Sequence, residues 1–171
     1  CVRDLLYELA VFIAVMIILQ AALSVPFFIS IKFCYNFIIF MKVEVIILDK
    51  AVKKFSPSVK KIADRIAKLF PKKAGIEVYI IGGKRMQALN KKFRGKNKST
   101  NVLSFQKPNN FPGTMLGEVY LDPIYIQKHK EDLALMLAHG VLHILGYDHE
   151  KKSDRIKMER REARLLSKLK A

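Results

Sequence analysis

Three of the four histidines of this chain lie within one short segment, residues 139–149, which reads HGVLHILGYDH. His139 and His143 are four residues apart in an otherwise apolar run, a spacing that places both rings on one face of a helix. Gly146 can adopt the left-handed conformation that ends a helix, which lets His149 return toward the first two rings. Three imidazoles directed at one point are the protein ligands of a catalytic zinc ion whose fourth position is left to water.

The alternative is a buried helix whose histidines are satisfied within the core. Three imidazoles at this spacing would be costly to bury without partners, whereas one metal ion satisfies all three. The segment also differs from the zinc protease motif, in which a glutamate follows the first histidine as general base. Gly140 takes that position here, so the sequence predicts a metal site but argues against peptide hydrolysis by that route.

The chain has 171 residues, enough for one domain with a hydrophobic core, and a net charge of +16 at pH 7. Charged residues before Met41 are few and cancel, so the whole excess lies in residues 41–171. Such a basic domain favours a polyanionic partner, nucleic acid or an anionic membrane, although a generally basic proteome would give the same composition. The cysteines, Cys1 and Cys34, lie outside this part, which argues against a disulfide framework and fits a reducing cytosol.

Residues 1–40 form a hydrophobic N-terminal extension. The uncharged run Leu9–Ile31 has 23 residues, enough to cross a bilayer as an anchor that leaves the basic domain in the cytoplasm. A misassigned start is the favoured interpretation, because the chain begins at Cys1 and Met41 directly precedes a strand-like segment; a signal peptide is a third. We expect the functional domain to be residues 41–171, with a membrane as partner only if the extension belongs to the natural protein.

From Met41 onward, strand and helix patterns alternate along the chain. The predicted strands are 43–48, 76–81, 101–105 and 116–121, and the predicted helices are 56–70, 84–93, a short one after Asp122-Pro123, 132–145 and 153–169. This order predicts a single α+β domain with a small mixed β-sheet, helices packed on it and the apolar histidine helix at its centre. In the last helix, the less exposed stripe is expected to contain Ile156, Glu159, Ala163 and Leu166.

These motifs resemble the YbeY family of metal-dependent endoribonucleases. Residues 139–149 match the family signature His-Gly-x-Leu-His-x-x-Gly-Tyr-Asp-His, residues 94–96 and 100–105 match Arg-Gly-Lys and Thr-x-Val-Leu-Ser-Phe, and residues 116–118 match Leu-Gly-acidic. The resemblance runs from Met41 to about Glu159, and residues 1–40 have no counterpart in it.

The resemblance implies an α+β fold with a zincin-like helix, a Zn²⁺ ion on His139, His143 and His149, and a catalytic role for Arg94. It implies a single-strand-specific endoribonuclease that processes the 3′ end of small-subunit ribosomal RNA and acts in ribosome quality control. Its partners would be ribosomal RNA, the small ribosomal subunit and ribosome-associated proteins, in the cytoplasm.

Three residues depart from the family pattern. Asn97 and Asn101 stand where the family usually has aspartate, and Gln106 stands where proline is usual. Fewer negative charges near Arg94 would loosen the orientation of its side chain or favour phosphate binding.

Arg94 is expected to contact the scissile phosphate, because a planar guanidinium suits phosphate oxygens. We expect the neighbouring lysines to hold the RNA backbone by salt-dependent contacts. These lysines are Lys91, Lys92, Lys96 and Lys98.

The remaining candidates near the motif have weaker assignments. Asp148 either orients a ligand ring or caps its own backbone. Ser104 is either a substrate contact or, as we favour, an ordinary strand residue. His129 is expected on the surface, and Tyr147 is expected to pack beside the turn.

The sequence leaves two other functions open. One is a metal-dependent hydrolase of a substrate other than RNA, which Gly140 and the basic charge oppose. The other is a non-catalytic RNA-binding or ribosome-assembly module with a structural zinc, which the three-ligand set opposes because structural sites normally have four protein ligands.

Overall fold

The computed structural model describes residues 41–70, 74–108 and 113–170, and residues from Met41 onward form one compact unit. The predictions for the N-terminal extension and for both cysteines fall outside the described residues. Within the described ranges, none of the helices has the length and hydropathy needed to cross a membrane.

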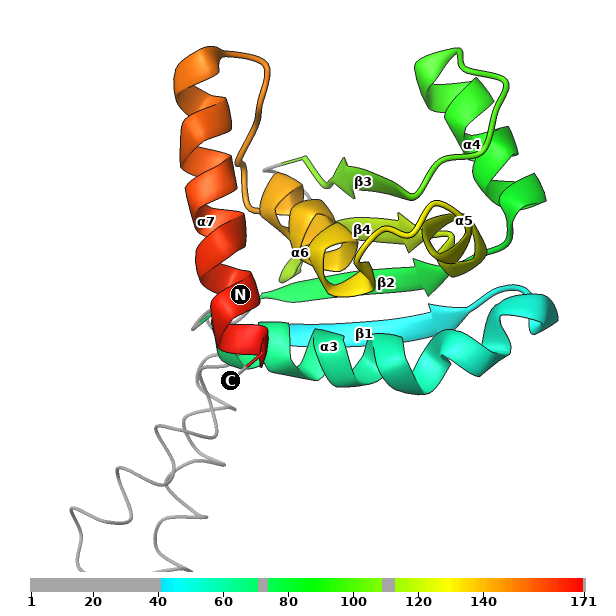
Figure 1. The fold of residues 1–171 in the computed structure, drawn as a ribbon, viewed down its shortest axis with the longest axis horizontal. Helices are drawn as coiled ribbons and strands as arrows, with labels where there is room; N and C mark the ends of the chain where they lie inside the picture. The colour runs from blue at the N-terminus through cyan, green and yellow to red at the C-terminus, as the bar shows by residue number, and fades with distance from the viewer. Residues whose placement is uncertain (1–40, 71–73, 109–112, 171) are drawn as a thin grey trace, which may run out of the picture. The chain divides into compact units, whose positions relative to one another are not determined.

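The unit is built on a four-stranded mixed sheet in the order β1-β2-β4-β3, in which β3 runs antiparallel to β4 and the other pairs are parallel (Figure 1). The elements are β1 (Lys42–Ile47), the 3-10 helix η1 (Lys50–Phe55), α3 (Ser56–Lys68), β2 (Gly75–Ile80), α4 (Gly83–Arg94), β3 (Val102–Gln106), β4 (Met115–Leu121), α5 (Pro123–Lys128), α6 (Leu133–Ile144) and α7 (Lys152–Lys170). The predicted α+β fold class is therefore confirmed.

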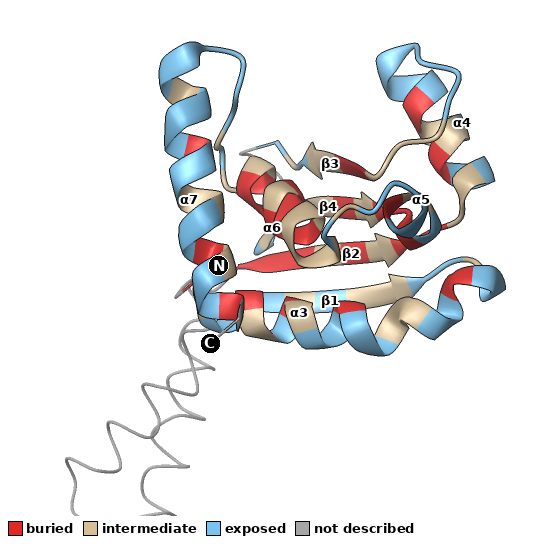
Figure 2. Ribbon diagram, in the orientation of Figure 1, coloured by how far each residue is buried: buried red, intermediate tan, exposed pale blue. Residues whose placement is uncertain are grey.

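The main core lies on the sheet face covered by α3 and α6 (Figure 2). On the central strand β2, Ile76, Val78 and Ile80 are fully buried, because alternate side chains of a strand point to the same face. Val59 and Ile66 of α3 are completely buried on the same side. The apolar periodicity of these segments thus sets which face of each element meets the core.

Helix α3 begins without a side-chain cap. Ser56 is the first helical residue, where the predicted range begins, and Phe55 precedes it with helical backbone angles and no capping side chain. The 3-10 helix η1 directly precedes α3 and continues into it without a break. The sequence pattern did not predict η1.

Helix α6 lies at the centre of the unit, where it packs against β3, β4, α3 and α7 (Figure 1). Its sheet-facing side includes Gly140, where an added Cβ would lie 2.7 Å from Val119 Cγ1 and 3.0 Å from Ser104 Oγ. Only a glycine allows this close approach of helix and sheet. The position that carries a glutamate in zinc proteases therefore faces the sheet here and has no room for a side chain.

The less exposed stripe predicted for α7 was wrong at three of its four positions. Ile156 is 41% exposed, and Glu159 and Ala163 are also exposed, whereas Leu166 is half-buried and packs against the core. The helix instead buries Met158, Leu165 and Leu169. Because α7 is highly charged, its own sequence pattern is weak, and the buried face is chosen by packing against α3 and α6.

Candidate metal centre and adjoining cleft

Helix α6 places His139 and His143 one turn apart, with their Nε2 atoms close together. Asp132 begins the helix by accepting hydrogen bonds from the backbone N–H groups of Ala134 (2.7 Å) and Leu135 (3.2 Å). The ring centroids of the two histidines are 4.7 Å apart, and their Nε2 atoms are 3.1 Å apart. The predicted same-face arrangement is present.

The turn after α6 brings the third histidine to the same place. Gly146 has a φ of +87°, in the left-handed region, and its N–H donates to the carbonyl oxygen of His143 at 3.0 Å. The ring of His149 then lies 5.6 Å from the His139 ring and 5.1 Å from the His143 ring, centroid to centroid. The predicted glycine bend is confirmed.

The three rings suit a metal ion by number, chemistry and spacing. One nitrogen from each ring lies within 4.8 Å of the other two. Two imidazole ligands of a tetrahedral zinc ion are about 3.3 Å apart, close to the 3.1 Å between His139 and His143. The wider ring separations involve His149, which is exposed and lies outside the helix.

The surroundings of His143 favour the neutral form of its ring. Burial lowers the pKa of His143, and the neighbouring His139 and His149 lower it further. A neutral imidazole is the form that binds a metal. The lowered pKa of His143 therefore favours metal binding by this ring at neutral pH.

A residue that sequence reasoning missed contacts the first histidine from α7. Glu162 Oε1 lies 2.7 Å from His139 Nδ1, and its side chain is only 16% exposed. Glu162 is 23 positions further along the chain and the stripe expected for α7 did not include it. The pair forms because α7 packs against α6, a contact that the sequence alone does not show.

Arg94 and the three histidines line one cleft with a volume of about 640 Å³. Arg94 is the last residue of α4, which ends at Gly95 in the left-handed conformation (φ +69°). The lining residues are Arg94, Lys96, Asn101, Val102, Ser104, His139, His143, Asp148, His149 and Glu150. The structure thus brings the two sequence motifs together in space.

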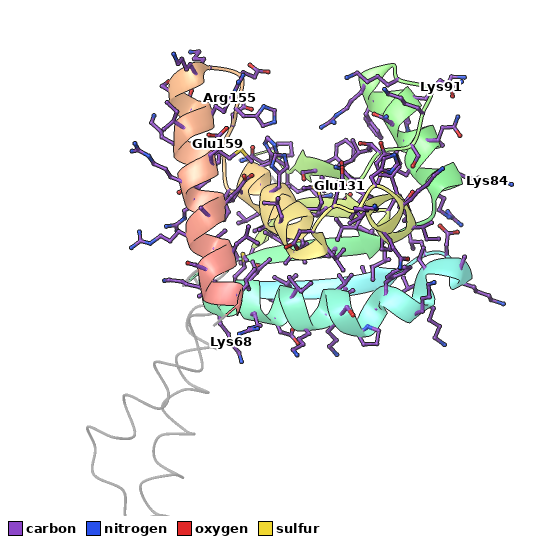
Figure 3. The ribbon with its side chains drawn as sticks, in the orientation of Figure 1. Lys68, Lys84, Lys91, Glu131, Arg155 and Glu159 are labelled. Carbon is purple, nitrogen blue, oxygen red and sulfur yellow. The ribbon has the colours of Figure 1, made fainter. Side chains whose placement is uncertain are left out.

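Of the four lysines expected to hold the RNA backbone, one lines the cleft and three lie on the outer surface. Lys96 lines the cleft, whereas Lys91, Lys92 and Lys98 are exposed and do not belong to its lining. Lys91 extends from the outer part of α4 (Figure 3). The sequence located a basic segment but did not show which of its charges reach the site.

Asn101, which stands where the family usually has aspartate, is held by hydrogen bonds of its side chain. Its side-chain Nδ2 donates to Glu131 Oε2 at 3.0 Å, and its Oδ1 accepts from the backbone N–H of Val102 at 2.7 Å. An aspartate would place a second carboxylate against Glu131. Asn101 is thus held by its own contacts, and Asn97 accepts a hydrogen bond from Gln87 at 3.3 Å. The effect expected on the orientation of Arg94 stays a prediction.

The structure also places the remaining candidate residues. Asp148 lines the cleft, but its Oδ1 accepts from the backbone N–H of His149 at 2.7 Å, which matches the backbone-capping alternative. Ser104 is a β3 residue that also lines the cleft. Tyr147 packs against the core, and His129 is exposed and stacks on Tyr125 at 3.9 Å between ring centroids.

Comparison with known proteins gives consistent results. A family model described as Endoribonuclease YbeY matches residues 44–170. An Endoribonuclease YbeY of Thermodesulfovibrio yellowstonii is 41% identical over 106 residues, which are 56% of this chain and 67% of that protein. One of Anaplasma marginale is 46% identical over 89 residues, 47% of this chain and 58% of that protein.

The chain thus spans about three-fifths to two-thirds of the length of these relatives. A solution structure of TM1509 from Thermotoga maritima aligns over 74% of this chain and 88% of that one, with 21% identity and a TM-score of 0.48. Since the family model covers most of residues 41–171, this chain belongs to the YbeY family of endoribonucleases.

Proposed function

We propose that this chain is a zinc-dependent endoribonuclease that cleaves single-stranded RNA, with residues 41–171 as its catalytic domain. The observation that carries the proposal is the shared cleft: three convergent histidines and an arginine from a distant part of the chain line one cavity. Family membership supports the same reaction class.

His139, His143 and His149 would hold the metal. A bound zinc ion supplies Lewis acidity and a water molecule whose pKa is lowered toward neutrality. Three imidazole ligands fit zinc better than magnesium or calcium, which prefer oxygen ligands.

The other cleft residues bind and orient the RNA. Arg94 presents a planar fork to a phosphate group and stabilises the negative charge that grows on it during cleavage. Lys96 adds a second cation on the same side. Besides the histidines, the described lining contains two carboxylate side chains, Asp148 and Glu150, and Gly140 offers no side chain that could act as a base.

Ribosomal RNA is the proposed substrate, at the 3′ end of the small-subunit RNA. The net charge of +16 and the family resemblance support this substrate class. A role in ribosome quality control, contacts with the small subunit and ribosome-associated proteins, and a cytoplasmic location belong to the same proposal.

The test uses the full chain and three substrates: a single-stranded RNA, the same RNA in a duplex, and a peptide. We expect cleavage of the single strand that stops with a chelator and returns with zinc. Chelator-sensitive peptide cleavage with intact RNA would favour the other hydrolase function. RNA processing that persists in Arg94→Ala, at unchanged metal content, would favour the structural-zinc module.

A further inference from the structure

The His139–Glu162 pair links the candidate metal site to the C-terminal helix. Glu162 Oε1 contacts Nδ1 of His139, whereas Nε2 of the same ring is the nitrogen that faces His143. The two nitrogens of an imidazole point to different sides of the ring. Glu162 therefore lies behind His139, on the side away from His143.

This hydrogen bond favours the tautomer of His139 that carries a proton on Nδ1. An ionised carboxylate only accepts hydrogen bonds, so Nδ1 of His139 is the donor across the 2.7 Å contact. In a neutral imidazole, Nε2 is then left with its lone pair. That lone pair points to the place where the Nε2 atom of His143 lies 3.1 Å away.

The position of Glu162 is set by the packing of α7. Met158 lies one turn before it and Leu165 one turn after it, and both are buried, at 1% and 4% exposure. Residues at this spacing share one face of a helix. A glutamate on a core-facing helix side is rare unless it is paired, and here the partner is His139.

We infer that Glu162 is a positioning residue that holds His139 in the orientation and tautomer needed to bind the metal. The inference rests on the proposed function and adds a residue that does not contact the substrate. Carboxylates that orient a ligating histidine typically change metal affinity by about 10–100-fold. The docking of α7 would thus contribute directly to the affinity of the metal site.

A neighbouring glutamate provides a matched control. Glu159 is also on α7 and, with Glu162, His139, His149, Arg155 and Met158, lines a smaller hollow of about 260 Å³. Figure 3 shows Arg155 and Glu159 on the side of α7 that faces α6. Glu159 is exposed, and within the described parts of the chain it has no hydrogen bond to a histidine.

The experiment measures zinc affinity of the full chain by competition with a chromophoric chelator, without RNA. We expect Glu162→Ala to weaken zinc binding by about 10–100-fold and Glu162→Gln by less, because a carboxamide oxygen still accepts from Nδ1. Glu159→Gln should change affinity by less than about twofold, since it alters charge at a similar place without touching His139.

A second readout distinguishes positioning from a general loss of structure. In nitrogen–proton correlation spectra of the metal-free protein, His139 should be the Nδ1–H tautomer in the wild type and lose this preference in Glu162→Ala. Unchanged zinc affinity in a folded Glu162→Ala protein, or equal effects of Glu159→Gln and Glu162→Gln, would overturn the inference. A wild-type chain that binds zinc no better than His143→Ala would instead overturn the proposed function.

Discussion

The two sides of the cleft are built in different ways. The histidine side comes mainly from α6, a helix packed on the sheet with Leu137, Ala138 and Leu142 fully buried. The arginine side comes from the end of α4 and the loop that follows it, where Arg94 and Lys96 are exposed. Packing in the core thus holds α6 on the histidine side, whereas the arginine side is exposed to solvent.

This difference matches the two tasks of the proposed enzyme. Metal ligands need fixed positions, which a helix anchored in the core provides, because side chains in a close-packed interior have little freedom. Phosphate groups of a flexible RNA are better met by long cationic side chains on an exposed loop. Mutations on the histidine side should therefore affect metal content and stability, and mutations on the arginine side should affect only RNA cleavage.

The largest effect is expected for His143→Ala. Removal of one of three ligands should abolish stoichiometric zinc binding and lower RNA cleavage by about 1,000-fold or more. Elemental analysis after dialysis, together with cleavage rates, measures both. His129→Ala is the control, since that exposed ring stacks on Tyr125 and should leave both values unchanged. Full metal content in His143→Ala would show that the ion is held elsewhere.

Arg94→Ala tests the other side. We expect cleavage to fall by about 100–1,000-fold with unchanged zinc content, because the lost guanidinium stabilises charge only on the bound phosphate. Arg94→Lys should restore part of the rate, since an ammonium group keeps the charge but not the planar fork.

Lys91→Ala is the matched control for Arg94→Ala, because this lysine is exposed on α4 and does not line the cleft. It should change the rate by only a few-fold. An equal loss in both variants would mean that Arg94 contributes general charge rather than a specific contact.

Gly140→Ala should affect stability more than chemistry. The new Cβ would meet Val119 Cγ1 at 2.7 Å, so α6 would have to move from the sheet at a cost of about 1–3 kcal/mol in the free energy of unfolding. Urea denaturation of the metal-free protein measures this. Gly82→Ala, where the nearest atom is 3.8 Å from the added Cβ, should cost less than about 1 kcal/mol. Equal costs would argue against close packing at Gly140.

The smallest expected effect is the change in the free energy of unfolding with pH. Burial lowers the pKa of His143 in the folded protein below the ordinary value of 6.5, so the unfolded chain binds the proton first as pH falls. Stability contributed by the neutral ring is present above pH 6.5 and declines below it. Urea denaturation of the metal-free protein between pH 7.5 and 5 should show a steeper decline for the wild type than for His143→Gln. Identical slopes would contradict the lowered pKa.

Much of the fold and the histidine cluster could be predicted from the sequence because both follow from local patterns. The apolar periodicity of β2 and α3 sets their buried faces, and His139, His143 and Gly146 interact within a few residues of one another. Such local relations are visible in a single sequence.

The contacts that were missed join distant parts of the chain. Glu162 reaches His139 only because α7 docks on α6, and Asn101 is held by Glu131, 30 positions further along the chain. The charged sequence of α7 has no clear periodicity, so its buried face depends on its neighbours. Which lysines line the cleft likewise depends on where α4 ends. Lys96 follows the helix and lines the cleft, whereas Lys91 lies within the helix and does not.

The proposed function depends on one zinc ion that His139, His143 and His149 bind together. X-ray absorption spectroscopy at the zinc edge, on the zinc-loaded full chain and on His149→Ala, counts these ligands. We expect three imidazole nitrogens and one oxygen at about 2.0–2.1 Å in the wild type, and two imidazoles in the variant. The same number of imidazole ligands in both proteins would contradict it.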